Sequence, residues 1–458
     1  MSQDTVQSLV GGLLQKGLSR RAFVSRAAAL GLSGTAISAI LQACGDSSSQ
    51  QSGQSTPTNL SGQITVWTWP DNDKTFAKTI PFFNKKFPNI KVNVQAFANA
   101  DTDYANKLLT AILSGSGPDV AMIEIGVVAK FKTKPGFVDL SKDPYNAGQY
   151  KDKFASYSWK YVSDDQTGKI FALPKNTGPG AMFYRRDLFQ KAGLPTEPAQ
   201  VSALLKDWDA FISVGKQLTV KNSQWMVAVP SQILLTIVNE AGLSYFDKQG
   251  KIQFGNPDYK TAMEYSKRAW DAGIISPLNE WSAEWGATMQ NGTVATYLYG
   301  NWFGGLLKSA YAQNTSGKWG VAQAPAYKGV SAFDSGGDFI GILEGSQNKQ
   351  LAWEFVKFVT QDPDSLKTMY LANDLYPAWS PVLTESWINN SDAYYSGQTV
   401  NQVFAKVQQG MVPPVTNPND SAGYTALSGA LNDVIKGQSS IDDALAKATQ
   451  QLKTQSGQ

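Results

Sequence analysis

The strongest restriction on the fold comes from two strand-like runs with no helix between them. The first run, Ile170–Leu173, ends at Pro174, and the second, Ala181–Tyr184, begins after a polar segment with two glycines and a proline. A helix is expected directly afterwards, because Gly193 and Pro195 follow at positions where a helix ends. Two strands joined by such an extended segment favour a chain that leaves one sheet and enters another. We therefore predict that this stretch crosses from one domain to a second.

The segment before the crossing alternates between strands and helices. The expected elements are a strand over Gln63–Trp67, a helix over Lys74–Phe87, a strand over Ile90–Val94, a helix over Tyr104–Leu113 and a strand over Asp119–Ile123. Short links between such elements indicate an open α/β sheet. Ligands of these sheets bind beyond the carboxyl ends of the strands. This rule places five side chains at the mouth of a cleft: Trp67, Trp69, Asp71, Asn72 and Glu124.

The chain beyond the crossing continues with helices, strands and two further returns. Helices are expected over Trp208–Leu218, Tyr259–Ala272, Trp281–Gln290 and Leu351–Thr360, and strands over Val294–Leu298, Val321–Pro325 and Phe333–Leu343. A third crossing is expected at Tyr376–Trp379, and closing helices over Leu427–Leu452. A chain of 458 residues is long enough for two domains, each with its own core.

Five motifs stand in a fixed order along the chain. They are the GKIFALP run from Gly168, the Tyr-x-x-Asp-Leu-Phe-x-Lys-Ala-Gly-Leu segment from Tyr184, the NGTVATYLYGNWF segment from Asn291, the Gly336-Gly337 turn with its following AWEFVKFVT helix, and the closing helices. Together they resemble family 1 extracellular solute-binding proteins, the maltose- and oligosaccharide-binding-protein-like receptors of ABC importers. The resemblance covers nearly all of residues 62–455. It implies an α/β, two-lobe periplasmic-binding-protein-like fold (type II), with an open, mainly parallel sheet flanked by helices in each lobe and a multi-strand hinge between the lobes.

The implied domain organisation has four parts. They are a twin-arginine and lipoprotein signal peptide over 1–43, a flexible tether over 44–62, lobe 1 over 62–174 plus about 330–375, and lobe 2 over about 178–325 plus 380–458. The tether is rich in Ser, Gln and Gly and has hardly any apolar residues, so it lacks the surface that would order it.

The N-terminal segment carries three export signals in order. Arg20 and Arg21 resemble the twin-arginine motif, and the apolar run over 27–41 is too short for a confident membrane-spanning helix. Leu-Gln-Ala then precedes Cys44, as in a lipobox, so that cleavage leaves a lipidated cysteine. We expect an extracytoplasmic protein held by lipid at the outer face of the cell membrane, or in a periplasm. The alternative is a short N-terminal helix with two chance arginines.

Charge and composition exclude several classes of function. The segment 1–43 holds four of the 40 basic residues and one of the 37 acidic residues, so the remainder carries 36 of each and offers no basic footprint for nucleic acid. The chain has no histidine and one cysteine, which removes the usual general base, the commonest metal ligand and the usual nucleophile–base pairs. No phosphate-binding loop or nucleophile elbow is found. We expect neither an enzyme nor a cofactor or metal.

Thirteen tryptophans and 18 tyrosines offer flat faces that stack on the apolar side of a sugar, while acids, amides and backbone N–H groups bond its hydroxyls. The ligand-binding candidates, with roles implied by the resemblance, are Trp67, Trp69, Asp71, Asn72, Glu124, Asn176, Trp281, Glu284, Trp302, Gly337, Asp338, Tyr376 and Trp379. Structural alternatives remain: a core position for Trp67, surface acids or caps for Asp71, Glu124 and Asp338, and backbone shaping for Asn176 and Gly337.

The resemblance implies a monomeric receptor that captures a mono- or oligosaccharide by hinge closure and delivers it to the permease of an ABC importer. Two alternatives stay open. A polyamine or another small solute would suit the same fold, since Asp71, Glu124, Glu284 and Asp338 are acids that attract a cation. A glycoside hydrolase would need only two carboxylates, such as Glu124 with Glu284 or Asp71 with Asp338.

Overall fold

The structure, a computed structural model, describes residues 60–98, 103–164 and 166–458. Predictions that concern the export signals, Arg20, Arg21, Cys44 and most of the tether lie outside these residues. Residues from Asn59 onward cluster as one unit of dense contacts. Within the described residues, no helix combines the length and the apolar character needed to cross a bilayer.

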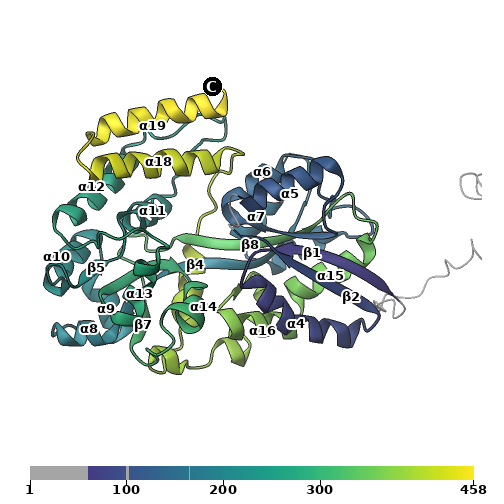
Figure 1. The fold of residues 1–458 in the computed structure, drawn as a ribbon, viewed down its shortest axis with the longest axis horizontal. Coiled ribbons are helices and arrows are strands. Elements are labelled where there is room, and N and C mark those ends of the chain that lie inside the picture. Colours follow the sequence, from purple (N-terminus) through teal and green to yellow (C-terminus); the bar gives the residue numbers. More distant parts are fainter. Residues whose placement is uncertain (1–59, 99–102, 165) are drawn as a thin grey trace, which may run out of the picture. The chain divides into compact units, whose positions relative to one another are not determined.

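The first half of the fold, called lobe 1 here, is built around three parallel strands (Figure 1). Its sheet has the order β2-β1-β3-β8-β4. The strands are β1 (Gly62–Thr68), β2 (Ile90–Ala96), β3 (Val120–Glu124), β8 (Asp334–Ile342) and β4 (Leu173–Arg185), and the helices are α4 (Asn72–Lys86), α5 (Asp103–Ser114), α6 (Val128–Lys132), α7 (Ser156–Val162), α15 (Lys349–Gln361) and α16 (Pro363–Asn373).

The second half, called lobe 2 here, continues the same sheet past β4 in the order β4-β6-β5, with β7 also paired to β4. Its further strands are β5 (Trp225–Val227), β6 (Val294–Gly300) and β7 (Trp319–Ala322), and its helices are α8 (Arg186–Lys191), α9 (Pro198–Leu204), α10 (Trp208–Leu218), α11 (Pro230–Glu240), α12 (Pro257–Asp271), α13 (Ala283–Asn291), α14 (Phe303–Leu306), α18 (Asp420–Ile435) and α19 (Ile441–Ser456). The short strand β9 (Tyr376–Pro377) and helix α17 (Asn401–Gly410) pack on β4 between the lobes.

One continuous strand makes the crossing, whereas the sequence predicted two strands and a linker. Leu173–Thr177 pairs with β8 in lobe 1, and Gly180–Tyr184 pairs with β6 in lobe 2. The register shifts next to Pro174 and Pro179, because proline has no N–H to give to the ladder. Gly178 lies so close to β8 that a Cβ atom there would sit 2.5 Å from the Gly336 carbonyl oxygen. The polar, proline-containing segment therefore belongs to the ladder itself.

Two further expectations need correction. The sheets are mixed rather than mainly parallel, because β4 and β8 run between the lobes and are antiparallel to the strands that they contact. The helix expected from Trp281 begins at Ala283 instead, since the Ser282 side chain caps it by accepting from the Trp285 N–H at 3.2 Å. Trp281 lies outside the helix with a φ of 65°.

Buried apolar side chains form two clusters, one that extends from lobe 1 into lobe 2 and one within lobe 2. In lobe 1, Phe76 and Phe83 on α4 pack against Phe355 on α15, with ring centroids 5.8 and 5.3 Å apart. In lobe 2, Phe254 packs edge-on against Tyr259 of α12 at 5.3 Å. The aromatic residues at three- and four-residue spacing in α4 thus face inward, as their periodicity predicts. Each rigid core fixes the strand ends that carry the candidate site.

Candidate functional site

The lobe 1 side of the candidate site is formed where β1 ends. Trp67 is half-buried, and its Nε1 donates to Gln95 Oε1 at 2.9 Å while its ring lies 4.8 Å from Phe97. Trp69 is also half-buried and meets Tyr104 edge-on at 5.6 Å. Both rings are anchored on one side, so the remaining surface of each keeps a fixed orientation.

A buried lysine brings three of the candidates together. The Lys175 Nζ atom donates to Asn72 Oδ1 at 2.8 Å and to Asn176 Oδ1 at 3.1 Å, and lies 3.5 Å from Asp338 Oδ2. Burial lowers the pKa of Lys175 and raises the pKa of Asp338, while the attraction between the two charges opposes both shifts. This set, called the Lys175 cluster here, comes from the N-terminus of α4, from β4 and from β8, and its polar groups largely satisfy one another.

Two other acids of lobe 1 already have partners. Asp71 adopts a φ of 73° before α4 and forms an ion pair with Lys74 at 2.8 Å. The pKa of Tyr311 in lobe 2 is raised mainly by burial of its phenol, and the negative charge of Asp71 raises it further. Glu124 ends β3 and accepts a hydrogen bond from the Gly126 N–H at 2.6 Å. Asp71 therefore already has a cationic partner, whereas Glu124 caps the turn after its own strand.

Lobe 2 contributes a group of aromatic rings, called the tryptophan group here. Trp281 and Trp302 lie nearly parallel, with centroids 6.2 Å apart and an interplanar angle of 23°. Trp302 Nε1 donates to the Ser335 carbonyl oxygen at 2.5 Å, which fixes this ring against the start of β8. Trp281 is 52% exposed, although it contacts Trp285 at 4.8 Å. The group thus offers open aromatic surface beside the crossing strands.

The remaining candidates have different positions. Glu284 is exposed in the first turn of α13. Gly337 adopts a φ of 144° on β8, opposite Thr177 of β4. Tyr376 is fully buried, with its hydroxyl 2.5 Å from Asn401 Oδ1, and Trp379 is buried 4.9 Å from Phe154. The rings of Tyr376 and Trp379 are therefore packed into the core, whereas Trp281 and Glu284 are exposed.

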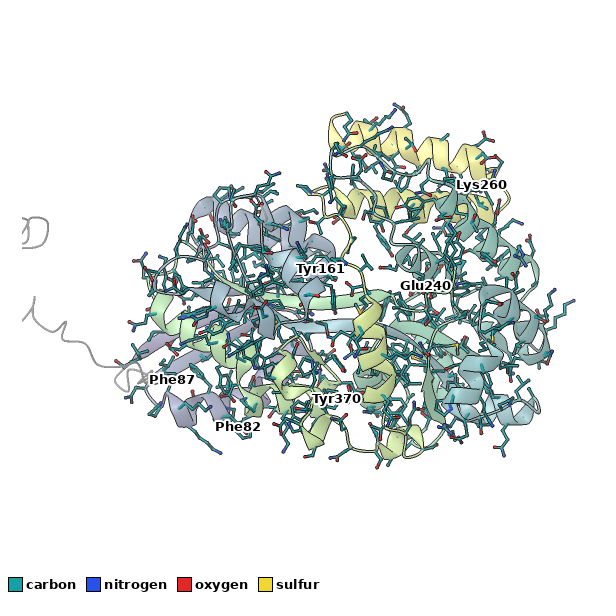
Figure 2. The ribbon with its side chains drawn as sticks, turned by 180° about the vertical axis from the view of Figure 1, so that it is seen from behind. Phe82, Phe87, Tyr161, Glu240, Lys260 and Tyr370 are labelled. Atoms are coloured by element: carbon teal, nitrogen blue, oxygen red, sulfur yellow. The ribbon has the colours of Figure 1, made fainter. Side chains whose placement is uncertain are left out.

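A cavity of about 170 Å³ lies between the lobes and was missed by the sequence analysis. Its lining comes from Ile125, Gly126 and Tyr161 of lobe 1, from Asn239, Ser244 and Tyr245 of lobe 2, from Asp334 and Gly336 on β8, and from Thr416 and Asp420 near α18, among others. Tyr161 lies on the side of lobe 1 that is turned toward lobe 2 (Figure 2). The Ser421 hydroxyl donates to the Gly126 carbonyl oxygen at 3.2 Å beside the cavity and joins the two lobes there.

A half-buried glutamate, bonded to Tyr299 beside the tryptophan group, was also missed. Glu280 accepts a short hydrogen bond from the Tyr299 hydroxyl, and burial raises the pKa of its carboxyl group. Its position directly before Trp281 is the one local feature of the sequence that could have indicated Glu280 as a site residue. In the described residues, no group of three or more His, Cys, Asp or Glu side chains is arranged to hold a metal ion.

Comparisons with known proteins agree with this geometry. The model of a family described as bacterial extracellular solute-binding protein matches residues 67–364. The lactose-binding protein of Rhizobium radiobacter is 27% identical over 362 residues, with 76% of this chain and 82% of that protein covered. The arabinooligosaccharide-binding protein of Bacillus subtilis strain 168 is 24% identical over 426 residues, with 89% and 95% covered.

Solved structures share the fold at low identity. One is a family 1 extracellular solute-binding protein, with a TM-score of 0.74 at 21% identity, covering 86% of this chain and 99% of that one. Another is the ABC-transporter-associated binding protein of B. animalis subsp. lactis in complex with β-1,6-galactobiose, with a TM-score of 0.73 at 24% identity and coverage of 87% and 98%. These likenesses confirm the predicted two-lobe α/β fold.

Proposed function

This chain belongs to the bacterial extracellular solute-binding protein family, and from that premise we propose that it captures a carbohydrate for an ABC importer. The tryptophan group is the observation that carries the proposal. Trp281 and Trp302 present nearly parallel faces beside the hinge strands, and the apolar C–H face of a sugar ring stacks on such surfaces. Relatives that are named for lactose and arabinooligosaccharides support a di- or oligosaccharide as the ligand.

The proposed mechanism is closure of the two lobes around the sugar. Lobe 2 binds first through its open rings, and lobe 1 then approaches with Trp67, Trp69 and Asp71. Three strands join the lobes, and the register shifts in β4 are the places where this strand can bend. The ligand stabilises the closed form, which then docks on the membrane permease.

We infer that the protein binds its ligand without converting it. Glycoside hydrolysis needs two free carboxyl groups on either side of the scissile bond. Asp338 is close to Lys175, Asp71 is paired with Lys74, and Glu124 accepts from a backbone N–H. These partners speak against both of the carboxylate pairs that the sequence offered.

The same contacts weaken the polyamine site that the sequence offered, which consists of Asp71, Glu124, Glu284 and Asp338. A polyamine would need several carboxylates whose charge is not already neutralised. Asp338 meets its cation within the protein, and Glu284 lies exposed in the first turn of α13. Asp71 is partly exposed but already forms an ion pair with Lys74.

Export and anchoring complete the proposal. The family is extracellular by its description, and we propose that Arg20 and Arg21 direct export and that a lipid on Cys44 holds the protein at the membrane. We propose a monomer with no nucleic-acid partner, because the chain outside 1–43 carries equal numbers of basic and acidic residues.

Thermal melting against a ligand panel tests the proposal. The chain from Gly45 onward contains the whole unit that begins at Asn59. A ligand that binds only the folded state raises the melting temperature by mass action. We expect lactose, maltotriose or β-1,6-galactobiose to raise it and to remain intact on long incubation. A shift with spermidine alone would replace the sugar by a cation, and loss of the saccharide would indicate hydrolysis.

A further inference from the structure

The cavity between the lobes contains two carboxyl groups with unsatisfied oxygen atoms. Asp334 is the first residue of β8, and its Oδ2 accepts from the Tyr161 hydroxyl at 3.1 Å. Asp420 is the first residue of α18, and its Oδ2 accepts from the Asn417 N–H at 2.7 Å. In each residue the second oxygen, Oδ1, is buried and has no hydrogen-bond partner. Because both residues line the cavity, a ligand there would lie against two carboxyl groups that each keep one unsatisfied oxygen.

No cation neutralises these carboxyl groups. In the part of the chain that the structure describes, neither forms an ion pair with lysine or arginine. The titratable groups that interact with them are phenols: Tyr157 and Tyr161 of α7 for Asp334, and Tyr161, Tyr245 and, on α12, Tyr259 for Asp420. Burial raises the pKa of Asp334 to about 8 and that of Asp420 to about 7. At Asp420 the hydrogen bond from the Asn417 N–H opposes this rise in pKa.

Whether the two carboxyl groups are protonated or ionised in a filled cavity depends on the chemistry of the ligand. A neutral hydroxyl can donate to either oxygen, but it adds no positive charge and displaces the water that solvates an anion. Hydrogen bonds from hydroxyl groups contribute less free energy than an unpaired carboxylate loses when it is removed from water. A protonated carboxyl group avoids that cost and can also donate to a hydroxyl oxygen. A cationic ligand would reverse the preference, because it would stabilise both carboxylates.

We propose that this cavity is a subsite for a neutral, hydroxyl-bearing group of the ligand, and that filling it binds protons to Asp334 and Asp420. The inference rests on the proposed function, since it assigns the charge of the ligand at one part of the same cleft. It makes capture proton-linked: affinity is highest in mild acid and falls as the two carboxyl groups ionise.

The pH dependence of affinity is the first test. The saccharide from the panel of lactose, maltotriose and β-1,6-galactobiose that binds is titrated at pH 6 and pH 9. Each proton that must be taken up weakens binding up to tenfold per pH unit, so we expect Kd to rise at least about tenfold over this range. In the double variant Asp334→Asn and Asp420→Asn, the ratio of the two Kd values should fall below about twofold. Asp442→Asn, in the exposed first turn of α19, is the matched control and should keep the full ratio.

Proton uptake by the unmodified protein is the second test, and it does not depend on whether the variants fold. Calorimetry at pH 7.5 in two buffers of different ionisation enthalpy should show protons taken up when the saccharide binds. Release of protons, or none exchanged, would overturn the inference while the carbohydrate receptor stands. Spermidine binding that strengthens with rising pH would overturn it as well. If no saccharide binds at all, the proposed function itself fails.

Discussion

The candidate residues of the two lobes differ in how far their groups are already satisfied. Lobe 2 carries the tryptophan group, whose rings meet one another but leave open faces such as that of Trp281. Lobe 1 carries the Lys175 cluster, whose polar atoms bond mainly to one another. Aromatic surface is not directional and gains free energy wherever it is covered, whereas a satisfied polar cluster gains little from a new partner. Lobe 2 should therefore supply most of the affinity, and the Lys175 cluster should mainly hold lobe 1 in shape.

Removal of the buried cation should have the largest effect. Lys175→Met leaves Asp338 without its counter-charge in a buried position, and we expect a loss of about 3 kcal/mol in the free energy of unfolding. Urea denaturation with an unchanged m-value measures it. The exposed pair of Lys267 and Asp271 provides the control, because Lys267→Met there should cost less than about 0.5 kcal/mol. Equal losses in the two variants would contradict a structural role for the cluster.

Among the residues that the structure describes, Asp334 has no cationic partner, whereas Asp338 has Lys175, and this difference should appear in how stability depends on pH. Its folded pKa of about 8 exceeds the unfolded value, so the folded state binds an extra proton at intermediate pH. The resulting stability is complete below about pH 4 and is lost as the pH rises toward 8, with a slope of up to about 1.4 kcal/mol per pH unit. Between pH 6 and pH 8, the free energy of unfolding of the Asp334→Asn variant should fall by about 2 kcal/mol less than that of the unmodified protein. Parallel stability curves for the two proteins would show that the carboxyl group ionises freely.

Trp302→Ala tests the affinity assigned to lobe 2. A half-buried ring at the centre of a binding surface commonly contributes about 2 kcal/mol, which corresponds to about a thirtyfold rise in Kd for the saccharide. Trp270→Ala removes another half-buried tryptophan, on α12 of lobe 2, and should leave Kd unchanged. Calorimetric titration of both variants decides the matter. A larger loss at Trp270 would place the ligand elsewhere.

Trp281→Ala should have the smallest effect, and that effect should be on binding rather than on folding. Its ring is 52% exposed, so the free energy of unfolding should change by no more than about 0.5 kcal/mol. We expect binding to weaken by about 1 kcal/mol, or about fivefold, because one of two stacked faces is lost. Melting without ligand and titration with it separate the two quantities. Unchanged affinity would assign the stacking surface to Trp302 alone.

The sequence predicts those parts of the fold that local pattern determines. The alternation of strands and helices before the crossing is confirmed, because each element there has its own periodicity. The continuity of β4 could not be predicted, since Pro174 and Pro179 are typical of a linker and only the distant β8 supplies the partner. The start of α13 was predicted two residues too early. Ser282 is an ordinary N-cap residue, but Trp281 continues the apolar pattern, so the pattern alone extends the helix to Trp281.

The candidate site was harder to predict from sequence than the fold. Strand-end reasoning places Trp67, Asn72 and Asp338 near the facing sides of the lobes, but it says nothing about Lys175 as their common partner. The cavity is lined by five segments that lie far apart in the chain, so no local spacing predicts Asp334 or Asp420. Tyr376 and Trp379 follow turns in the sequence, and only tertiary packing decides that their rings turn inward.

The pairing of β3 with β8 has a consequence for the order of synthesis. Strand β3 ends at Glu124, and the strand that covers its edge begins at Asp334, so the ribosome adds about 210 residues between them. At roughly 5 to 20 residues per second, the edge of the growing sheet waits about 10 to 40 seconds for its neighbour. An uncovered strand edge is a template for association with other chains. The nascent protein therefore needs protection of this edge until β8 has been synthesised, late in translation.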